Sequence, residues 1–132
     1  MYIVGMGEES RSTIVTNALP IGEPIYLFKA TDNKEVTCLH GHEGYYVTDG
    51  PFFYYENGKP IMIWSSYSNG RYLVLEAESD NGKLDGNWIH RGSRLTFDGG
   101  HAMIFENLEG KRMISLHSPN NADNERAKFF EY

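Results

Sequence analysis

The sequence has little of several features that define whole classes of protein. It contains one cysteine, Cys38, among 132 residues, so an internal disulfide is excluded and a small, semi-buried thiol is the default interpretation. No apolar run approaches the ~18 residues that a membrane-spanning helix needs. Residues 1–10 also lack the basic region and apolar stretch of an export signal. We therefore expect no membrane partner, find no signal peptide in this chain and assign it no cellular location.

Positive charge is also scarce. The 12 lysines and arginines are outnumbered by 18 aspartates and glutamates, which gives a formal net charge of -6, and no run of basic residues reverses this balance locally. Such a surface repels a phosphate backbone, so we expect no nucleic-acid partner. A neutral ligand fits this composition better.

Helical periodicity is absent, whereas short apolar and aromatic runs recur about every ten residues between glycine, asparagine and aspartate. Aromatic residues make up 14% of the chain, which argues against disorder. The pattern predicts an all-β protein. The ten predicted strands cover residues 2–6, 13–18, 25–30, 51–55, 61–66, 72–78, 87–90, 102–106, 112–117 and 127–131.

The turns indicate how these strands are joined. Asn57-Gly58 has the residues that a two-residue β-hairpin turn requires, and 68–70 and 108–110 have a similar character. The hairpins 52–64 and 103–116 share one layout and lie about fifty residues apart, a spacing typical of propeller blades. We predict a β-propeller fragment of about two and a half blades of antiparallel four-stranded sheets. It forms a single partial domain over residues 1–132, with an incomplete first blade (1–45), a second blade (46–98) and a last blade (99–132).

Five motifs in order carry a resemblance to a known family. They are Thr48-Asp49-Gly50-Pro51-Phe52-Phe53, Ile63-Trp64-Ser65-Ser66, Gly82-Lys83-Leu84-Asp85-Gly86-Asn87-Trp88, Gly99-Gly100-His101-Ala102-Met103 and Leu116-His117-Ser118-Pro119-Asn120. Together they resemble the C-terminal portion of family-43 glycoside hydrolases. These are five-bladed propellers of the arabinosidase, xylosidase and arabinanase type, which act on arabinose- and xylose-containing glycans.

The resemblance implies a catalytic set of three carboxylates: a base that activates water, an acid that protonates the leaving oxygen, and a third that adjusts the acid's pKa. In the family, the base and the third carboxylate lie upstream of the part that resembles this chain, so neither has a counterpart here. Asp49 occupies the general-acid position, where the family usually has the longer glutamate. The alternative role for Asp49 is to open an Asx turn. Glu43 is the alternative acid.

Four further residues are candidates for the site, and two of them, His101 and Arg126, resemble family residues. His101 corresponds to a histidine that faces the central channel and holds a calcium ion or a water cluster, whereas His117, Arg126 and Trp64 are candidate substrate-binding residues. Each has a structural alternative: a turn or core residue for His101, a capping residue for His117, a solvated charge for Arg126 and packing between blades for Trp64. The pair His40 and His42 has metal-ligand spacing, but few further ligands stand near it in the sequence.

These observations predict a glycoside hydrolase-like module that is incomplete and weakly active or inactive as an isolated chain. Its expected ligands are a carbohydrate and, in the central channel, a calcium ion, with no organic cofactor. The alternative is a non-catalytic, carbohydrate-binding or oligomerising half-propeller. Because exposed blade edges favour pairing with another chain, we expect a homo-oligomer.

Overall fold

The computed structural model describes residues 2–3, 13–16, 19–20, 23–95 and 97–132, and the described strands form three antiparallel sheets. The first sheet has the order β1-β2-β3 and consists of β1 (Tyr2–Ile3), β2 (Thr13–Thr16) and β3 (Leu19–Pro20). The predicted strands 2–6 and 13–18 thus contain β1 and β2, while residues 4–6 and 17–18 lie outside the described residues.

The middle sheet is a four-stranded meander in the order β4-β5-β6-β7. Its strands are β4 (Asp49–Glu56), β5 (Lys59–Ser68), β6 (Arg71–Ser79) and β7 (Trp88–Arg91). The first two hairpins turn at Asn57-Gly58 and Asn69-Gly70, and all four residues have the positive φ of a type I′ turn. The turn residues therefore fix the register of this sheet, as the sequence predicts.

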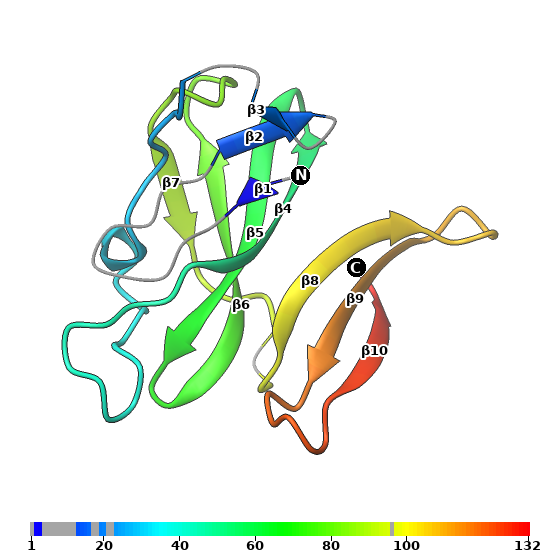
Figure 1. The fold of residues 1–132 in the computed structure, drawn as a ribbon. Coiled ribbons are helices and arrows are strands. Elements are labelled where there is room, and N and C mark those ends of the chain that lie inside the picture. The colour runs from blue at the N-terminus through cyan, green and yellow to red at the C-terminus, as the bar shows by residue number, and fades with distance from the viewer. Residues whose placement is uncertain (1, 4–12, 17–18, 21–22, 96) are drawn as a thin grey trace.

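The last sheet has the order β10-β9-β8 and is formed by β8 (Gly100–Glu106), β9 (Arg112–Ser118) and β10 (Arg126–Glu131). Figure 1 shows it beside the middle sheet, with the β5–β6 turn, the start of β8 and the β9–β10 loop toward the same lower edge. The candidate site lies near this edge.

One predicted strand is wrong. Residues 24–29 have no ladder partner, and the chain then forms a short 3-10 helix over Ala30–Asp32, where Asp32 Oδ2 accepts a hydrogen bond from the backbone N–H of Lys29 at 2.8 Å. Phe28 and Ala30 are nevertheless buried against the middle sheet. The apolar pattern over 25–30 therefore reflects packing onto a sheet and not membership of one.

The middle sheet is buried on both faces because its side chains alternate between two hydrophobic clusters. The first cluster lies on the face that Phe28 covers and comprises Phe28, Ala30, Met62, Trp64, Leu75, Ala77 and Trp88. The second lies between the middle and last sheets and comprises Ile63, Val74, Ala102, Ile114 and Leu116. These contacts pack β5 and β6 of the middle sheet against β8 and β9 of the last sheet.

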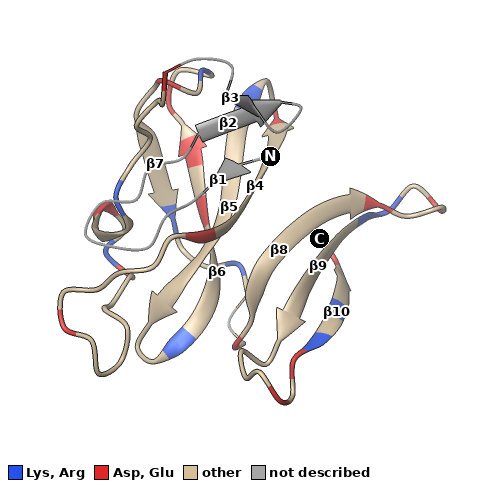
Figure 2. Ribbon diagram, in the orientation of Figure 1, with Lys and Arg blue, Asp and Glu red and all other residues tan. Residues whose placement is uncertain are grey.

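Charged residues of both signs are distributed over all parts of the described fold that Figure 2 colours. Lys and Arg positions are scattered among Asp and Glu positions in the view of Figure 2. Within the described part of the chain, no helix has the length and apolar character needed to cross a bilayer.

Candidate functional site

A cavity of about 430 Å³ brings together residues that are far apart in the sequence. It receives Asp49 from the start of β4, His101 from the start of β8 and His117 from the end of β9. Three of the predicted site residues thus meet in one place. The complete lining is Leu39, Val47, Asp49, Tyr67, Tyr72, His101, His117, Asn120 and Glu125.

Irregular pairing at the start of two strands positions two of these side chains. The register of β4 against β5 shifts between Asp49 and Phe52, and the register of β8 against β9 shifts between Gly100 and Met103. A bulge bends a strand and redirects the side chains beside it. Asp49 is the last paired residue before the bulge of β4, whereas His101 lies within the bulge of β8, where it corresponds to Gly50 of β4 and shares its positive φ.

Two glycines allow these strands to approach each other. Gly50 has a φ of +49°, and a Cβ there would lie 2.7 Å from the backbone Cα of His101. A Cβ on Gly100 would lie 2.2 Å from Cε1 of the Tyr72 ring. Neither distance is compatible with a side chain, so the Gly-Gly-His motif reflects close packing at the site.

Asp49 is the centre of a polar cluster. Its Oδ2 accepts a hydrogen bond from the Tyr72 hydroxyl at 2.8 Å, and its Oδ1 accepts one from the backbone N–H of Gly50 at 2.9 Å. His101 Nε2 lies 3.1 Å from the same Oδ1. The side chains of Asp49 and His101 remain 38% and 50% exposed, so a ligand can reach both.

Aromatic rings form one wall of the cavity. The Tyr72 ring stacks on the His117 ring with centroids 5.7 Å apart and 14° between the planes, and the His101 and His117 rings lie 5.2 Å apart. Burial is the main cause of a strongly raised Tyr72 pKa, and the charge of Asp49 adds to it. Tyr72 therefore remains a protonated hydrogen-bond donor at neutral pH.

The β9–β10 loop is tied to this wall through Asn120. Its side-chain Oδ1 lies 3.1 Å from His117 Nε2, and its Nδ2 donates to the Tyr67 hydroxyl at 3.1 Å. Asp98 binds both the β5–β6 hairpin and the β9–β10 loop, because its carboxylate accepts the backbone N–H of Tyr72 at 3.0 Å and that of Asn120 at 2.8 Å. The loop and the β5–β6 hairpin are thus held in a fixed relation.

The chain is similar in structure to an endo-arabinase from Bacteroides thetaiotaomicron. The likeness has a TM-score of 0.82 and 33% sequence identity, and it covers 93% of this chain and 45% of the neighbour. This chain therefore spans less than half the length of that enzyme. Neither a protein-family model nor a curated protein matches the sequence. The likeness confirms the predicted fold, an all-β fragment of a propeller.

The other predicted site residues lie away from the cavity. Trp64 is only 1% exposed and packs on Phe28 with ring centroids 5.3 Å apart, so it lies in the core of the described residues, where it cannot stack on a sugar. Glu43 is exposed and does not line the cavity. Arg126 is also exposed, and its Nη1 donates to the carbonyl of Glu125 at 2.6 Å, while Glu125 itself lines the cavity.

The predicted calcium ion has no cluster of ligating histidine, cysteine, aspartate or glutamate side chains in the described residues. Ca²⁺ takes six to eight oxygen ligands. In the described part of the chain, no group of three or more histidine, cysteine, aspartate or glutamate residues converges to hold a metal ion, and this includes His40 and His42. His101 directs Nε2 toward Asp49. Calcium at His101 remains a prediction.

The sequence pattern did not single out Tyr72, Tyr67 or Asn120 as site residues. A signal for the tyrosines was present, since they flank the Asn69-Gly70 turn and pair directly across it. Asn120 had a signal too, because it ends the motif that contains His117.

Proposed function

We propose that the chain is part of a family-43-type glycoside hydrolase and that its cavity binds an arabinose-containing glycan. The observation that carries the proposal is the meeting of Asp49, His101 and His117, three residues of the motifs, in one cavity of a fold similar to that of an endo-arabinase. The hydroxyl groups of a sugar bind to hydrogen-bond donors and acceptors, and its apolar face packs against aromatic rings. The lining offers both.

Asp49 is the proposed general acid, which protonates the leaving oxygen as the glycosidic bond breaks. That role needs a partner carboxylate to activate water, and by resemblance the base and the third carboxylate belong to an upstream part of such an enzyme. A single acid–base group commonly contributes about 10²–10⁴ in rate. The isolated chain is therefore expected to bind glycan far better than it hydrolyses it.

Calorimetry with arabinotriose and xylotriose tests the binding proposal, and release of nitrophenol from a nitrophenyl arabinofuranoside tests turnover. We expect saturable binding of arabinotriose that Asp49→Asn weakens and Glu43→Gln, outside the cavity, leaves unchanged. Any residual turnover should vanish in Asp49→Asn. The absence of saturable binding by either sugar would rule out a glycan site, and preference for xylotriose would reassign the sugar.

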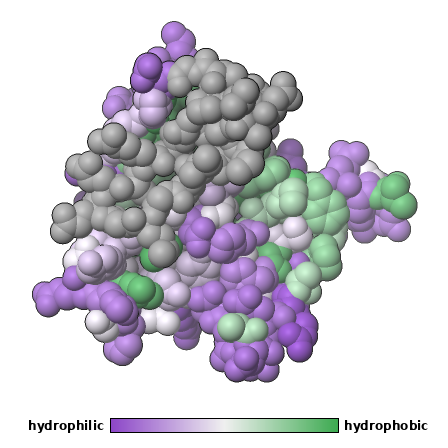
Figure 3. Space-filling view, viewed as in Figure 1, coloured by the Kyte–Doolittle hydropathy of each residue, from purple (hydrophilic) through white to green (hydrophobic). Residues whose placement is uncertain are grey.

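A second candidate function, assembly of the chain with another copy of itself, is favoured by an apolar sheet face. Met103 and Phe129 are 51% and 60% exposed, and both pair with Ser115, which places them on the same face of the last sheet with Phe105. The Phe105 and Phe129 rings meet edge to face at 6.2 Å. Figure 3 shows hydrophobic surface gathered over this sheet. Contiguous apolar faces of this kind mark interaction sites.

We propose a second copy as the occupant of this face, because two copies of the chain together approach the length of the endo-arabinase neighbour. Sedimentation at micromolar concentration should then show a self-association that Phe129→Lys weakens and Lys128→Gln, the adjacent position on the opposite face, does not. A stable monomer under these conditions would eliminate the second copy as occupant.

A further inference from the structure

Tyr72 contacts each of the three predicted site residues that meet in the cavity. Its hydroxyl donates to Asp49, its ring stacks on His117, and the centroid of the His101 ring lies 6.1 Å away. We propose that Tyr72 is a positioning residue that fixes the Asp49 carboxylate for glycan binding and catalysis. The inference rests on the proposed function and adds a residue that neither the family motifs nor the sequence pattern had marked.

The ring of Tyr72 has little freedom to move. Only 3% of the residue is exposed, and the ring lies against the bare backbone of Gly100. The backbone on either side of the ring is also held, since the Tyr72 N–H donates to Asp98 and the Tyr72 carbonyl accepts the Gly99 N–H at 2.8 Å. The Tyr72 hydroxyl is therefore held at one position, within hydrogen-bond distance of Asp49 Oδ2.

The direction of this hydrogen bond is fixed as well. Because the Tyr72 pKa is strongly raised, the phenol keeps its proton and can only donate to a carboxylate oxygen that carries none. Tyr72 holds Oδ2 in this way, while Oδ1 accepts the Gly50 N–H and lies beside His101 Nε2. Tyr72 thus supplies the contact that fixes the Oδ2 end of the carboxylate and, with it, the orientation of the group.

This positioning matters more for an aspartate than for a glutamate. Asp49 is one methylene shorter than the glutamate usual at this position in the family, and proton transfer depends on placing the proton within hydrogen-bond distance of the leaving oxygen. A short side chain has fewer conformations with which to reach that hydrogen-bond distance. A fixed one, held by a buried phenol, presents its oxygen at a constant position.

The test combines Tyr72→Phe, which removes only the hydroxyl, with Asp49→Asn and with the double variant. Tyr55→Phe is the matched control, because Tyr55 is 64% exposed on β4 and lies outside the cavity lining. The affinity of each protein for arabinotriose is measured by calorimetry. The side-chain carboxyl ¹³C signal of Asp49 is followed by NMR in the proteins that keep Asp49, and it reports the hydrogen bond without any ligand.

We expect Tyr72→Phe to weaken arabinotriose binding about tenfold in the natural background, the effect of losing a hydrogen bond to a charged group, and by less than about twofold in the Asp49→Asn background. We expect the carboxyl signal of Asp49 to move in Tyr72→Phe and to stay in place in Tyr55→Phe.

Equal losses of affinity in both backgrounds would make Tyr72 a structural residue and overturn the inference, as would an unmoved carboxyl signal. If the signal moves but no protein binds arabinotriose, the proposed function fails, and the positioning role fails with it, although the hydrogen bond is real. Binding that survives unchanged in Tyr72→Phe would leave the proposed function standing and remove this inference alone.

Discussion

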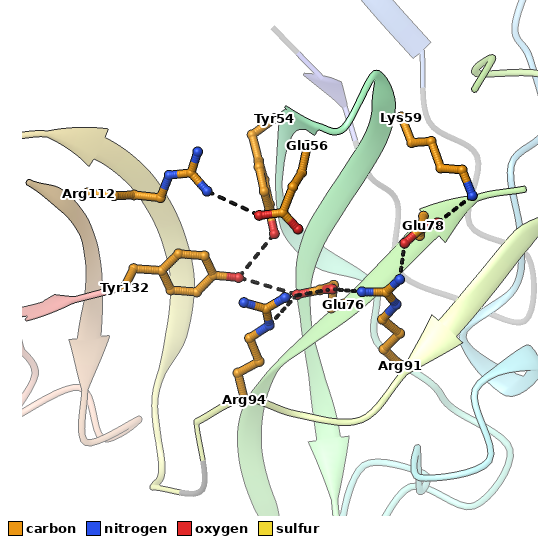
Figure 4. A network of polar contacts seen from close by, with 9 residues as sticks. All are labelled: Tyr54, Glu56, Lys59, Glu76, Glu78, Arg91, Arg94, Arg112 and Tyr132. Carbon is orange, nitrogen blue, oxygen red and sulfur yellow. Dashed lines mark hydrogen bonds and ion pairs between the residues drawn. The ribbon is translucent and has the colours of Figure 1, made fainter.

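Replacement of Glu76 by glutamine should destabilise the protein more than any other charge-neutralising change in its polar network. Figure 4 shows Glu76 of β6 at the centre of that network, which joins the middle and last sheets. Its Oε2 lies 2.8 Å from Arg94 Nε and accepts the Tyr132 hydroxyl at 3.3 Å, while its Oε1 lies 3.3 Å from Arg91 Nη1. The last residue of the chain and two arginines thus share one carboxylate.

The magnitude follows from the burial of the partners. The Glu76 side chain is 2% exposed, whereas those of Arg91 and Arg94 are 46% and 47% exposed. Breaking a fully buried pair costs about 3–5 kcal/mol, mostly because an unpaired charge stays out of water. Here the arginines can turn toward water once Glu76 is neutral. We therefore expect Glu76→Gln to cost about 3 kcal/mol, at the low end of that range.

The chain offers a matched control in Glu56, which faces Arg112 at 3.3 Å between the same two sheets but is 35% exposed. An exposed pair contributes about 0–1 kcal/mol, so Glu56→Gln should cost under 1 kcal/mol. Urea unfolding, followed by tryptophan fluorescence at low salt and again at 0.5 M salt, measures the loss of unfolding free energy in both variants. Salt should reduce the small effect at Glu56 and leave that at Glu76 nearly unchanged. Equal costs for the two variants would refute the reasoning.

Three further changes test the fold and the site. Burial lowers the His90 pKa from 6.5, so on acidification the unfolded chain takes up a proton at this position before the folded protein does, and stability should fall as the pH drops below about 6.5. In urea titrations between pH 7.5 and 5, the free energy of unfolding should fall less in His90→Leu than in His42→Leu, the control at an exposed histidine. Gly100→Ala should cost about 1–3 kcal/mol through its clash with Tyr72, seen as a lower melting temperature, and an unchanged melting temperature would contradict that clash. Trp64→Leu should cost about 3 kcal/mol in urea unfolding and leave arabinotriose affinity intact, whereas lost affinity with full stability would restore the stacking role.

Much of the fold was predictable because it depends on local signals. Asn57-Gly58 and Asn69-Gly70 specify turns of one type, and a turn of known type fixes the register of the strands that it joins. The segment 25–30 was predicted wrongly for the opposite reason. Phe28 is buried against a sheet whose strands follow it in the sequence, so the segment 25–30 has the apolar composition of a strand. No local signal distinguishes a strand from a segment that packs on a sheet.

The candidate site was predictable only where a motif and a bulge coincide. Asp49 and His101 stand at the register shifts of β4 and β8, beside the glycines that mark them in the sequence. Trp64 lies in an equally recognisable motif, but its side chain points to the other face of a sheet that is covered on both faces. Whether a motif residue reaches a ligand depends on which face is covered, and that is a property of the assembled sheets.

The repeated bulge accounts for what each of the two hairpins contributes to the cavity. Each hairpin of the repeat brings one residue from the start of its first strand to the cavity, a carboxylate from β4 and an imidazole from β8. Of these two strands, only β4 contributes a carboxylate to the cavity. Binding and hydrolysis are therefore expected to separate in this chain, since an aromatic wall and one fixed carboxylate suffice for the first and not for the second.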